Sequence, residues 1–218
     1  MSRSYIRTIA TLSFAVVAVA SQAAVYVQTI PTFTDTSGGD SMTTMLAKFN
    51  PSWGTLLAVS IGYTNTASGS NTVTNIDVAP GTYSNSVHSD STISVYEDSL
   101  TYGITDMRNA DASATGFLLN PGSSDTESAA DSISTTASSS WAAILSAYSG
   151  AGNVIVTQSS FGIASGTGDH QVQNAGSEFA QSSGYLIYEY RPAVPAPAAA
   201  GTMLIGMIGG FVRRKRSA

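Results

Sequence analysis

The chain contains no cysteine, and only 11% of its 218 residues are charged. The missing thiol excludes disulfide bonds, thiol catalysis, zinc fingers, iron–sulfur clusters and c-type haem attachment. Basic residues are scarce, since nine Lys and Arg stand against fourteen Asp and Glu. Six of the nine lie near the chain ends, which leaves three against all fourteen acids in the central part, a net charge near −11. Such a surface disfavours nucleic acid, whose binding depends on basic side chains that neutralise phosphates.

Length and composition favour one β-rich domain. The 218 residues suffice for a single ordinary domain once the two ends are set aside. Ser, Thr, Gly, Ala and Asn are abundant, and Tyr is the commonest aromatic residue. Thr suits pleated strands, and Gly, Asn and Ser supply turns. Helix-favouring residues other than Ala are few, so we expect an all-β fold.

Residues 1–23 have the three parts of a secretory signal peptide. Two arginines precede the apolar segment 9–20, which is too short to span a membrane comfortably. Small residues follow, and we expect signal peptidase to cut between Ala23 and Ala24. A second cleavage site at 18–20, and retention of the segment as an N-terminal anchor, are the alternatives.

The C-terminal end also has three parts. Residues 191–197 form a Pro-rich linker, which favours a stiff, extended backbone. The apolar run 198–212 follows and is predicted to form a transmembrane-type helix, although fifteen residues only approach the ~30 Å of a hydrocarbon core. The tail 213–218 is basic and is expected to stay at the cytoplasmic face. Its stop-transfer block consists of Arg213, Arg214, Lys215 and Arg216.

This arrangement resembles the PEP-CTERM sorting signal, in which a short Pro-containing motif, an apolar helix and an Arg-rich end follow one another. The motif of that family is Val-Pro-Glu-Pro, and the matching residues here are Val194, Pro195, Ala196 and Pro197. The resemblance implies processing by an exosortase, a membrane-embedded cysteine transpeptidase. An ordinary single-pass anchor is the alternative.

Residues 24–190 contain repeated strand signals. Large side chains alternate with small or polar ones in 57–64, and the same period of two recurs in 72–78 and 92–96. Segments 25–30, 154–161 and 185–190 are further candidate strands, and the last is apolar on both faces, which is typical of a central, covered strand. Turns are predicted at 37–40, 68–71, 79–81 and 120–122.

A single segment has helical period. Trp141, Ile144, Leu145 and Tyr148 follow the i, i+3, i+4, i+7 pattern, with serines before them and Gly150 after them. We expect this short helix to lie across the end of the sheets. Short strands together with a single helix predict a jelly-roll-like β-sandwich.

The central domain resembles the choice-of-anchor E family. Segment 48–56, Lys-Phe-Asn-Pro-Ser-Trp-Gly-Thr-Leu, is similar to an opening motif of that family. Segment 147–154 resembles its Gly-rich turn before a late strand, and segment 185–190 resembles its last strand. Such domains occur with different C-terminal surface anchors, so the resemblance implies a surface location and no known chemistry.

Residues capable of catalysis are few. His88 and His170 both stand in Ser-, Asp- or Gly-rich contexts that predict exposed loops. No metal-binding HExxH motif and no GxSxG nucleophile motif is present. Glu97 and Asp98 are adjacent carboxylates, for which a turn at the end of a strand is the favoured interpretation over a catalytic pair.

Two kinds of binding residue are conceivable. Asp125, Glu127 and Asp131 are weak calcium candidates, in what we expect to be a Ser-rich loop before the helix; a solvated acidic loop is favoured. Asp35 and Asp40 are a similarly weak pair of calcium candidates. Three tyrosines could stack on sugars: Tyr63, Tyr83 and Tyr102. Packing within the sheet is the commoner role of tyrosine in strands.

Three functions are compatible with these features. The first hypothesis is a non-enzymatic, exported surface or extracellular-matrix protein, sorted by an exosortase-type system and associated with exopolysaccharide. It needs no cofactor, and its processing partners are signal peptidase and the transpeptidase. After transient anchoring in the inner membrane by its C-terminal helix, it would reach the cell surface, outer membrane or matrix. The alternatives are a carbohydrate-binding module with calcium-supported loops, and a secreted hydrolase of unrecognised type.

Overall fold

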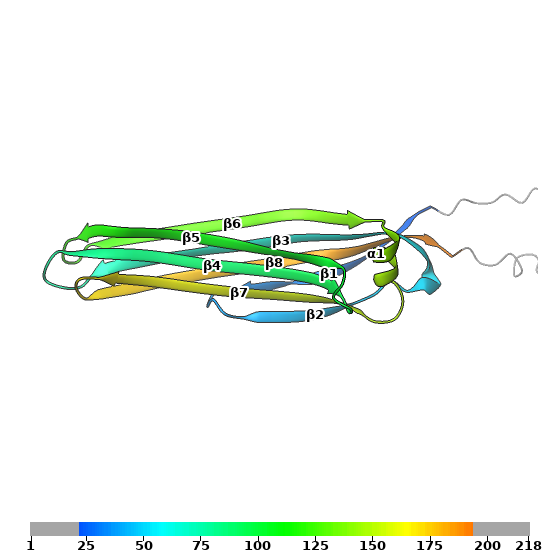
Figure 1. Cartoon of the computed structure of the whole chain (residues 1–218), viewed down its shortest axis with the longest axis horizontal. Helices are drawn as coiled ribbons and strands as arrows, with labels where there is room; N and C mark the ends of the chain where they lie inside the picture. The colour runs from blue at the N-terminus through cyan, green and yellow to red at the C-terminus, as the bar shows by residue number, and fades with distance from the viewer. Residues whose placement is uncertain (1–21, 194–218) are drawn as a thin grey trace, which may run out of the picture.

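Two antiparallel four-stranded sheets face each other in the computed structural model, which describes residues 22–193 (Figure 1). The first sheet has the order β1 (Ala24–Asp35), β8 (Val172–Pro192), β3 (Gly54–Asn75) and β6 (Ser124–Ser139). The second has the order β2 (Ser41–Ala47), β7 (Asn153–Gly168), β4 (Gly81–Glu97) and β5 (Gly103–Leu119). The predicted all-β sandwich is therefore confirmed. The signal peptide up to residue 21, the sorting motif 194–197, the apolar helix 198–212 and the basic tail lie outside the described residues.

The strands are nested in pairs. β1 pairs with β8, β2 with β7, β3 with β6, and β4 with β5, all antiparallel. Each successive pair alternates between the sheets, a connectivity that eight-stranded jelly rolls share. The strands run along the long axis of the molecule (Figure 1). β3 alone, with 22 residues, extends about 70 Å at 3.3 Å per residue.

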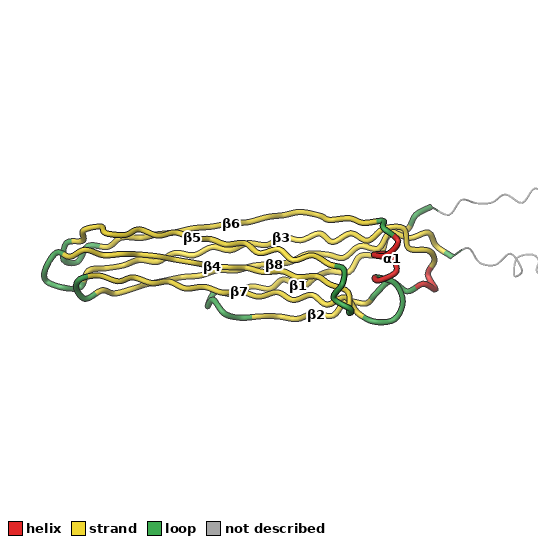
Figure 2. Tube along the Cα trace, viewed as in Figure 1, coloured by secondary structure: helices red, strands yellow, loops and turns green. Residues whose placement is uncertain are grey.

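The two ends of the sandwich differ. One end, here called the terminal end, holds the start of β1, the end of β8 and both helical segments (Figure 2). The other, here called the hairpin end, holds the connections 76–80, 120–123 and 169–171. Arg191 and Pro192 are the last residues of β8, so the predicted linker 191–197 begins inside a strand.

The predicted helix is confirmed as α1 (Ala142–Ala147), which joins β6 of one sheet to β7 of the other. Ile144 and Leu145 pack against the hydrophobic core, and Tyr148, the residue that ends the helix, is 1% exposed. The Tyr148 hydroxyl donates to the carbonyl of Tyr102 at 3.1 Å. The helical period of apolar residues therefore marks the face that covers the end of the core.

The 48–56 motif builds the other part of this end. Asn50 caps a single 3₁₀ turn, η1 (Pro51–Trp53), because its side chain accepts from the Ser52 N–H at 3.0 Å. Gly54 follows with φ of 147°, and a Cβ atom there would lie 1.9 Å from the Arg191 carbonyl oxygen. Only glycine fits this position, where β3 begins beside the end of β8.

Several strand predictions need correction. The predicted turn at 68–71 is wrong, because β3 continues through it and pairs with β6 and β8 on its two sides. The strand predicted over 72–78 ends at Asn75, and Ile76 and Val78 are exposed in the following loop. Segment 185–190 is central, between β1 and β3, but it is not covered on both faces, since Tyr185 is 38% exposed.

The interior changes character along the sandwich. Near the terminal end it is apolar, with fully buried residues that include Val59, Ile93 and Leu186. Towards the hairpin end many inward positions of β3 and β4 are polar, beside a small second apolar cluster of Val73, Tyr83 and Leu119. The buried polar residues there are Asn65, Asn71, Asn75, Asn85, Ser89 and Ser91. Strand alternation is retained, but asparagine and serine replace the branched side chains.

Asparagine side chains connect the two sheets in this polar half. Asn65 of β3 donates to the Ser91 carbonyl at 2.9 Å and to the Asp106 carboxylate at 2.9 Å, and it accepts from the Ser91 hydroxyl at 2.6 Å. Asn71 donates to the Asn85 side-chain oxygen at 2.8 Å, and Asn85 donates to the Asn71 carbonyl at 2.9 Å. Buried polar groups stabilise a fold only when they are paired, so these bonds specify how the sheets face each other.

Tyrosine rings lie over cross-strand glycines at three places. Each tyrosine and its glycine are direct antiparallel partners, and a Cβ atom on the glycine would lie within 2.5 Å of the ring. The ring therefore fills the space that a missing side chain leaves on the pleated surface, a known remedy for glycine in a strand. The three pairs are Tyr185 with Gly62, Tyr83 with Gly168, and Tyr96 with Gly103.

Candidate functional site

The outer face of the first sheet carries rows of hydroxyl groups. Alternate residues of β3 and β6 point away from the core, and nearly all of them are Ser or Thr. We call this surface the hydroxyl face. Its hydroxyl residues are Ser60, Thr64, Thr66, Ser68, Ser70, Thr72 and Thr74 on β3, Ser124, Thr126, Ser128, Ser132, Ser134, Thr136 and Ser138 on β6, and Ser177 and Ser183 on β8.

Many of these hydroxyls are hydrogen-bonded across the strands. Ser60 and Ser138 are 2.7 Å apart, and the pairs Ser70 with Ser177, Thr72 with Thr126 and Thr74 with Ser124 are each 2.8 Å apart. A hydroxyl has one donor and two acceptor lone pairs, so each pair keeps unused hydrogen-bonding capacity. The rows thus form a preoriented array that can still bind a polar ligand.

Two aromatic residues interrupt the rows, both on β8. Tyr185 covers Gly62, and its hydroxyl lies 3.1 Å from that of Thr136. Phe179 is half-buried and pairs with Ser68 of β3. Both belong to the outward set of β8, because the inward-facing Ala180, Leu186 and Tyr188 alternate with it.

A shallow groove surrounds each ring. The groove beside Tyr185 has a volume of about 630 Å³, and the groove beside Phe179 about 570 Å³. Residues such as Thr64 and Ser134 line the first groove, and Ser70 and Ser128 line the second. Binding pockets for small molecules have volumes of roughly 300–1,000 Å³, so both grooves are large enough for a ligand.

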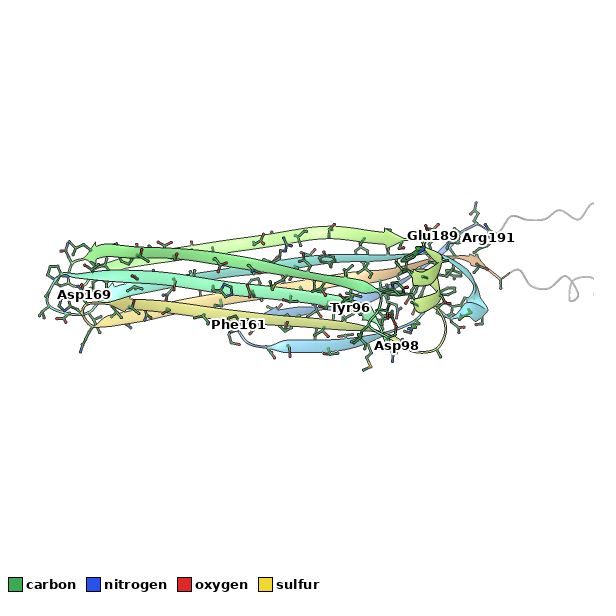
Figure 3. The ribbon with its side chains drawn as sticks, viewed as in Figure 1. Tyr96, Asp98, Phe161, Asp169, Glu189 and Arg191 are labelled. Atoms are coloured by element: carbon green, nitrogen blue, oxygen red, sulfur yellow. The ribbon has the colours of Figure 1, made fainter. Side chains whose placement is uncertain are left out.

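The hydroxyl face is nearly free of charge. Among the outward positions of β3, β6 and the paired part of β8, the charged residues are Glu189 and Arg191. Figure 3 shows Glu189 beside Arg191 at the terminal end, away from the hairpin end where Asp169 lies. A domain with fourteen acids therefore presents one long surface from which acidic groups are almost excluded.

The tyrosines proposed from the sequence as sugar platforms lie elsewhere. Tyr83 is 1% exposed and packs with Val73 and Leu119 inside the sandwich, so it cannot stack on a ligand. Tyr63 and Tyr102 are partly buried against the main core. The packing role considered for these residues is therefore the correct one. Tyr185 was overlooked because segment 185–190 is apolar at successive positions, which hides which residues face outward.

The weak calcium candidates are not in a loop. Asp125, Glu127 and Asp131 lie on the edge strand β6, with their side chains directed towards the space between the sheets. Asp125 accepts from Asn85 at 3.3 Å, and Asp131 lies 3.6 Å from the Arg108 guanidinium. Within residues 22–193, no three His, Asp or Glu side chains come together as a possible metal site. The prediction of a loop failed because Ser-rich strands lack an apolar face.

Inward charge on an edge strand prevents another strand from pairing there, because pairing would bury the charge. Self-association begins above a threshold protein concentration, and we expect Glu127→Val to lower this threshold at least tenfold. Light scattering after size-exclusion chromatography measures this threshold. Glu189→Val removes the same charge from the central strand β8 and should leave the threshold at the wild-type value. Equal behaviour of the two variants would contradict the protective role of Glu127.

His88 is not in a loop either. It lies on β4, where its Nδ1 faces Asp111 of β5 and its Nε2 lies 3.0 Å from Asp90. The hydrogen bond with Asp111 raises the pKa of His88 against the opposing effect of burial, and Asp90 raises it further. With a carboxylate at each ring nitrogen, neither nitrogen is free to take a proton from a serine, as a hydrolase would require. His170 does lie in a loop, 3.6 Å from Asp77.

Two further acids, Glu97 and Asp35, hold turns. Glu97, the last residue of β4, accepts from the N–H groups of Ser99, Thr101 and Tyr102, as expected for a strand-end turn. Asp35 accepts from Ser37, Gly39, Asp40 and Ser160, so its carboxylate is occupied by the loop after β1. The hydrogen bond from Ser160, followed by that from Ser37, keeps the pKa of Asp35 far below its ordinary value.

Comparison with known proteins assigns no family to this chain. No family model and no curated protein sequence matches the chain. Solved structures of infectious bursal disease virus match weakly. The Gx strain structure is 14% identical over 85% of this chain and 42% of its own, with a TM-score of 0.20. The VP2 subviral particle is 14% identical over 89% of this chain and 50% of its own, also with a TM-score of 0.20. The chain thus spans half or less of these viral chains.

No helix within residues 22–193 is long and apolar enough to cross a membrane.

Proposed function

We propose that this protein is a non-enzymatic, exported surface or extracellular-matrix protein whose sandwich associates with polysaccharide. The observation that carries the proposal is the nearly uncharged hydroxyl face with its two aromatic grooves. A surface of hydroxyls and aromatic rings suits a polymer that itself consists of hydroxyls and apolar ring faces. The contacts of His88 and Glu97 support a binding role over a catalytic one, since Asp90 and Asp111 occupy both ring nitrogens of His88 and turn N–H groups occupy the Glu97 carboxylate.

Delivery is the second part of the proposal. A signal peptide over 1–23 and an exosortase-type sorting signal from Val194 onward would place the sandwich outside the cell. The start of β1 and the end of β8 lie at the same end of the sandwich, so both segments would leave the hydroxyl face clear. The jelly-roll-like domain would then extend from its point of attachment.

Native protein from the outer-surface fraction tests both parts. Intact-mass analysis should give a chain that starts at Ala24 and ends near 194–197, without the basic block that begins at Arg213. The same protein should co-sediment with the insoluble polysaccharide of the matrix and be released by a glycosidase that degrades it. Retention of the full tail in the membrane fraction would overturn the exosortase part alone. Absence of matrix association would overturn the proposed function.

A further inference from the structure

We infer that the hydroxyl face binds a neutral, extended polysaccharide chain along β8, with Tyr185 and Phe179 each stacking against one sugar ring. The inference rests on the proposed function and names the ligand class and the residues that recognise it. It concerns a surface separate from the acids and histidines that the sequence singled out.

The two rings have the spacing of a linear ligand site. Tyr185 and Phe179 are six residues apart on one strand and face the same side. At 3.3 Å per residue this separation is about 20 Å, a distance that several linked sugars span. A single extended chain can therefore contact both rings while it lies parallel to the strands, whereas one isolated sugar could contact only one ring.

The hydroxyl pairs beside each ring provide polar contacts. Thr64 and Ser134 are 3.2 Å apart in the groove beside Tyr185, and Ser70 and Ser177 are 2.8 Å apart beside Phe179. Because cross-strand bonds already orient these side chains, a ligand would order few additional rotamers on binding. The cross-strand partners Gly62 and Ser68 are small, so neither ring is covered by a larger side chain from β3.

Charge selects a neutral polymer over an anionic one. The outward residues between Phe179 and Tyr185 on β8 are Gln181 and Ser183, and none of them carries a charge. Glu178 lines the Phe179 groove, where burial and the nearby Asp35 raise its pKa. No basic residue lines either groove, so a uronate or sulfate group would meet no counter-charge in either of them.

Affinity electrophoresis of the full-length protein tests the inference. The gel contains hydroxyethylcellulose or dextran as neutral glucans, or alginate as an anionic polymer. We expect at least one neutral glucan, and not alginate, to retard the wild-type protein. Tyr185→Ala and Phe179→Ala should each weaken the association at least tenfold. Tyr185→Phe keeps the ring and should stay within about twofold of wild type, which separates the contribution of the ring from that of the hydroxyl group. Phe161→Ala, on the outer face of the second sheet, is the matched control and should leave the retardation unchanged.

Several outcomes would overturn the inference. These are no retardation by either neutral glucan, retardation by alginate alone, or equal weakening by Phe161→Ala. A concentration-dependent dimer that Tyr185→Ala abolishes would assign the face to a second copy of this chain. If Tyr185→Ala and Phe179→Ala proteins still co-sediment with native matrix as wild type does, the proposed function stands and this binding face is wrong.

Discussion

Replacing Asn65 with aspartate is expected to lower the free energy of unfolding by about 3 kcal/mol or more at pH 7. Asn65 is fully buried, and its amide nitrogen lies 2.9 Å from the Asp106 carboxylate. Aspartate would lose this donor and set two carboxylates against each other where little water screens them. For a domain of this size the loss corresponds to a decrease in Tm of about 6–12 °C.

Thermal unfolding followed by circular dichroism at several pH values checks this result. The loss of stability in Asn65→Asp relative to wild type should become smaller as the pH falls, because protonation of either carboxylate restores a donor between the pair. Asn65→Leu has no charge and should show a deficit without that recovery. Thr66→Val, the next residue on the opposite face of β3, should change stability by less than about 0.5 kcal/mol. A deficit in Asn65→Asp that does not change with pH would contradict the proposed repulsion with Asp106.

Replacing Glu97 with glutamine is expected to lower the free energy of unfolding by about 2 kcal/mol or more at pH 7. Glu97 is 1% exposed, and charged acceptors contribute more than neutral ones to hydrogen bonds with backbone N–H groups. Burial alone would raise its pKa, but the bonds from Ser99, Thr101 and Tyr102 together lower the pKa of Glu97 to about 2. The carboxylate thus holds the β4–β5 turn.

The lowered pKa fixes the direction of the pH effect. The stabilisation is complete above the ordinary glutamate pKa of 4.5 and is lost as the pH falls from there towards about 2. The difference in stability between wild type and Glu97→Gln should therefore be constant above pH 5 and disappear across this acidic window. Denaturant unfolding at pH 7, 4 and 2.5 measures it, with Glu189→Gln as the exposed control. A difference that grows on acidification would show that Glu97 is protonated in the native protein.

The sequence predicted those parts of the fold that use large apolar side chains. Ile144, Leu145 and Tyr148 revealed α1 because a helical stripe was needed to cover the apolar end of the sandwich, whereas Trp141 of the same pattern is 63% exposed. Alternation around Val59 and Ile61 revealed β3 for the same reason. Such periodicity reports the burial of large apolar side chains, and most of these lie near the terminal end.

The polar half of the sandwich could not be recognised in this way. Inward positions such as Asn71 and Ser89 look like turn residues in sequence, and their role depends on partners in the other sheet. Asp125 and Glu127 suggested a loop because no large apolar side chain stands between Leu119 and Ile133, although they occupy a regular strand. Propensity therefore predicted a turn at 68–71, where long-range strand pairing instead determines the structure.

The candidate site was only partly visible in the sequence. A hydroxyl residue at nearly every second position from Ser124 to Ser138 is a period-two signal that could have been found. What could not be found is the register that sets this row beside the row of β3, or the side of the sheet to which Tyr185 points. Both depend on pairings between residues far apart in the chain.

The side-by-side placement of the chain ends has a mechanical consequence. Ala24 at the start of β1 pairs with Tyr190 near the end of β8, so pulling these two ends apart would break their hydrogen bonds one after another. A load that enters through a ligand on the hydroxyl face and leaves through the end of β8 acts differently. It runs parallel to the strand, and the bonds that β8 makes to β1 and β3 share it along their length. The same domain would then yield to peeling while resisting shear, the direction in which a polymer attached to its face would pull.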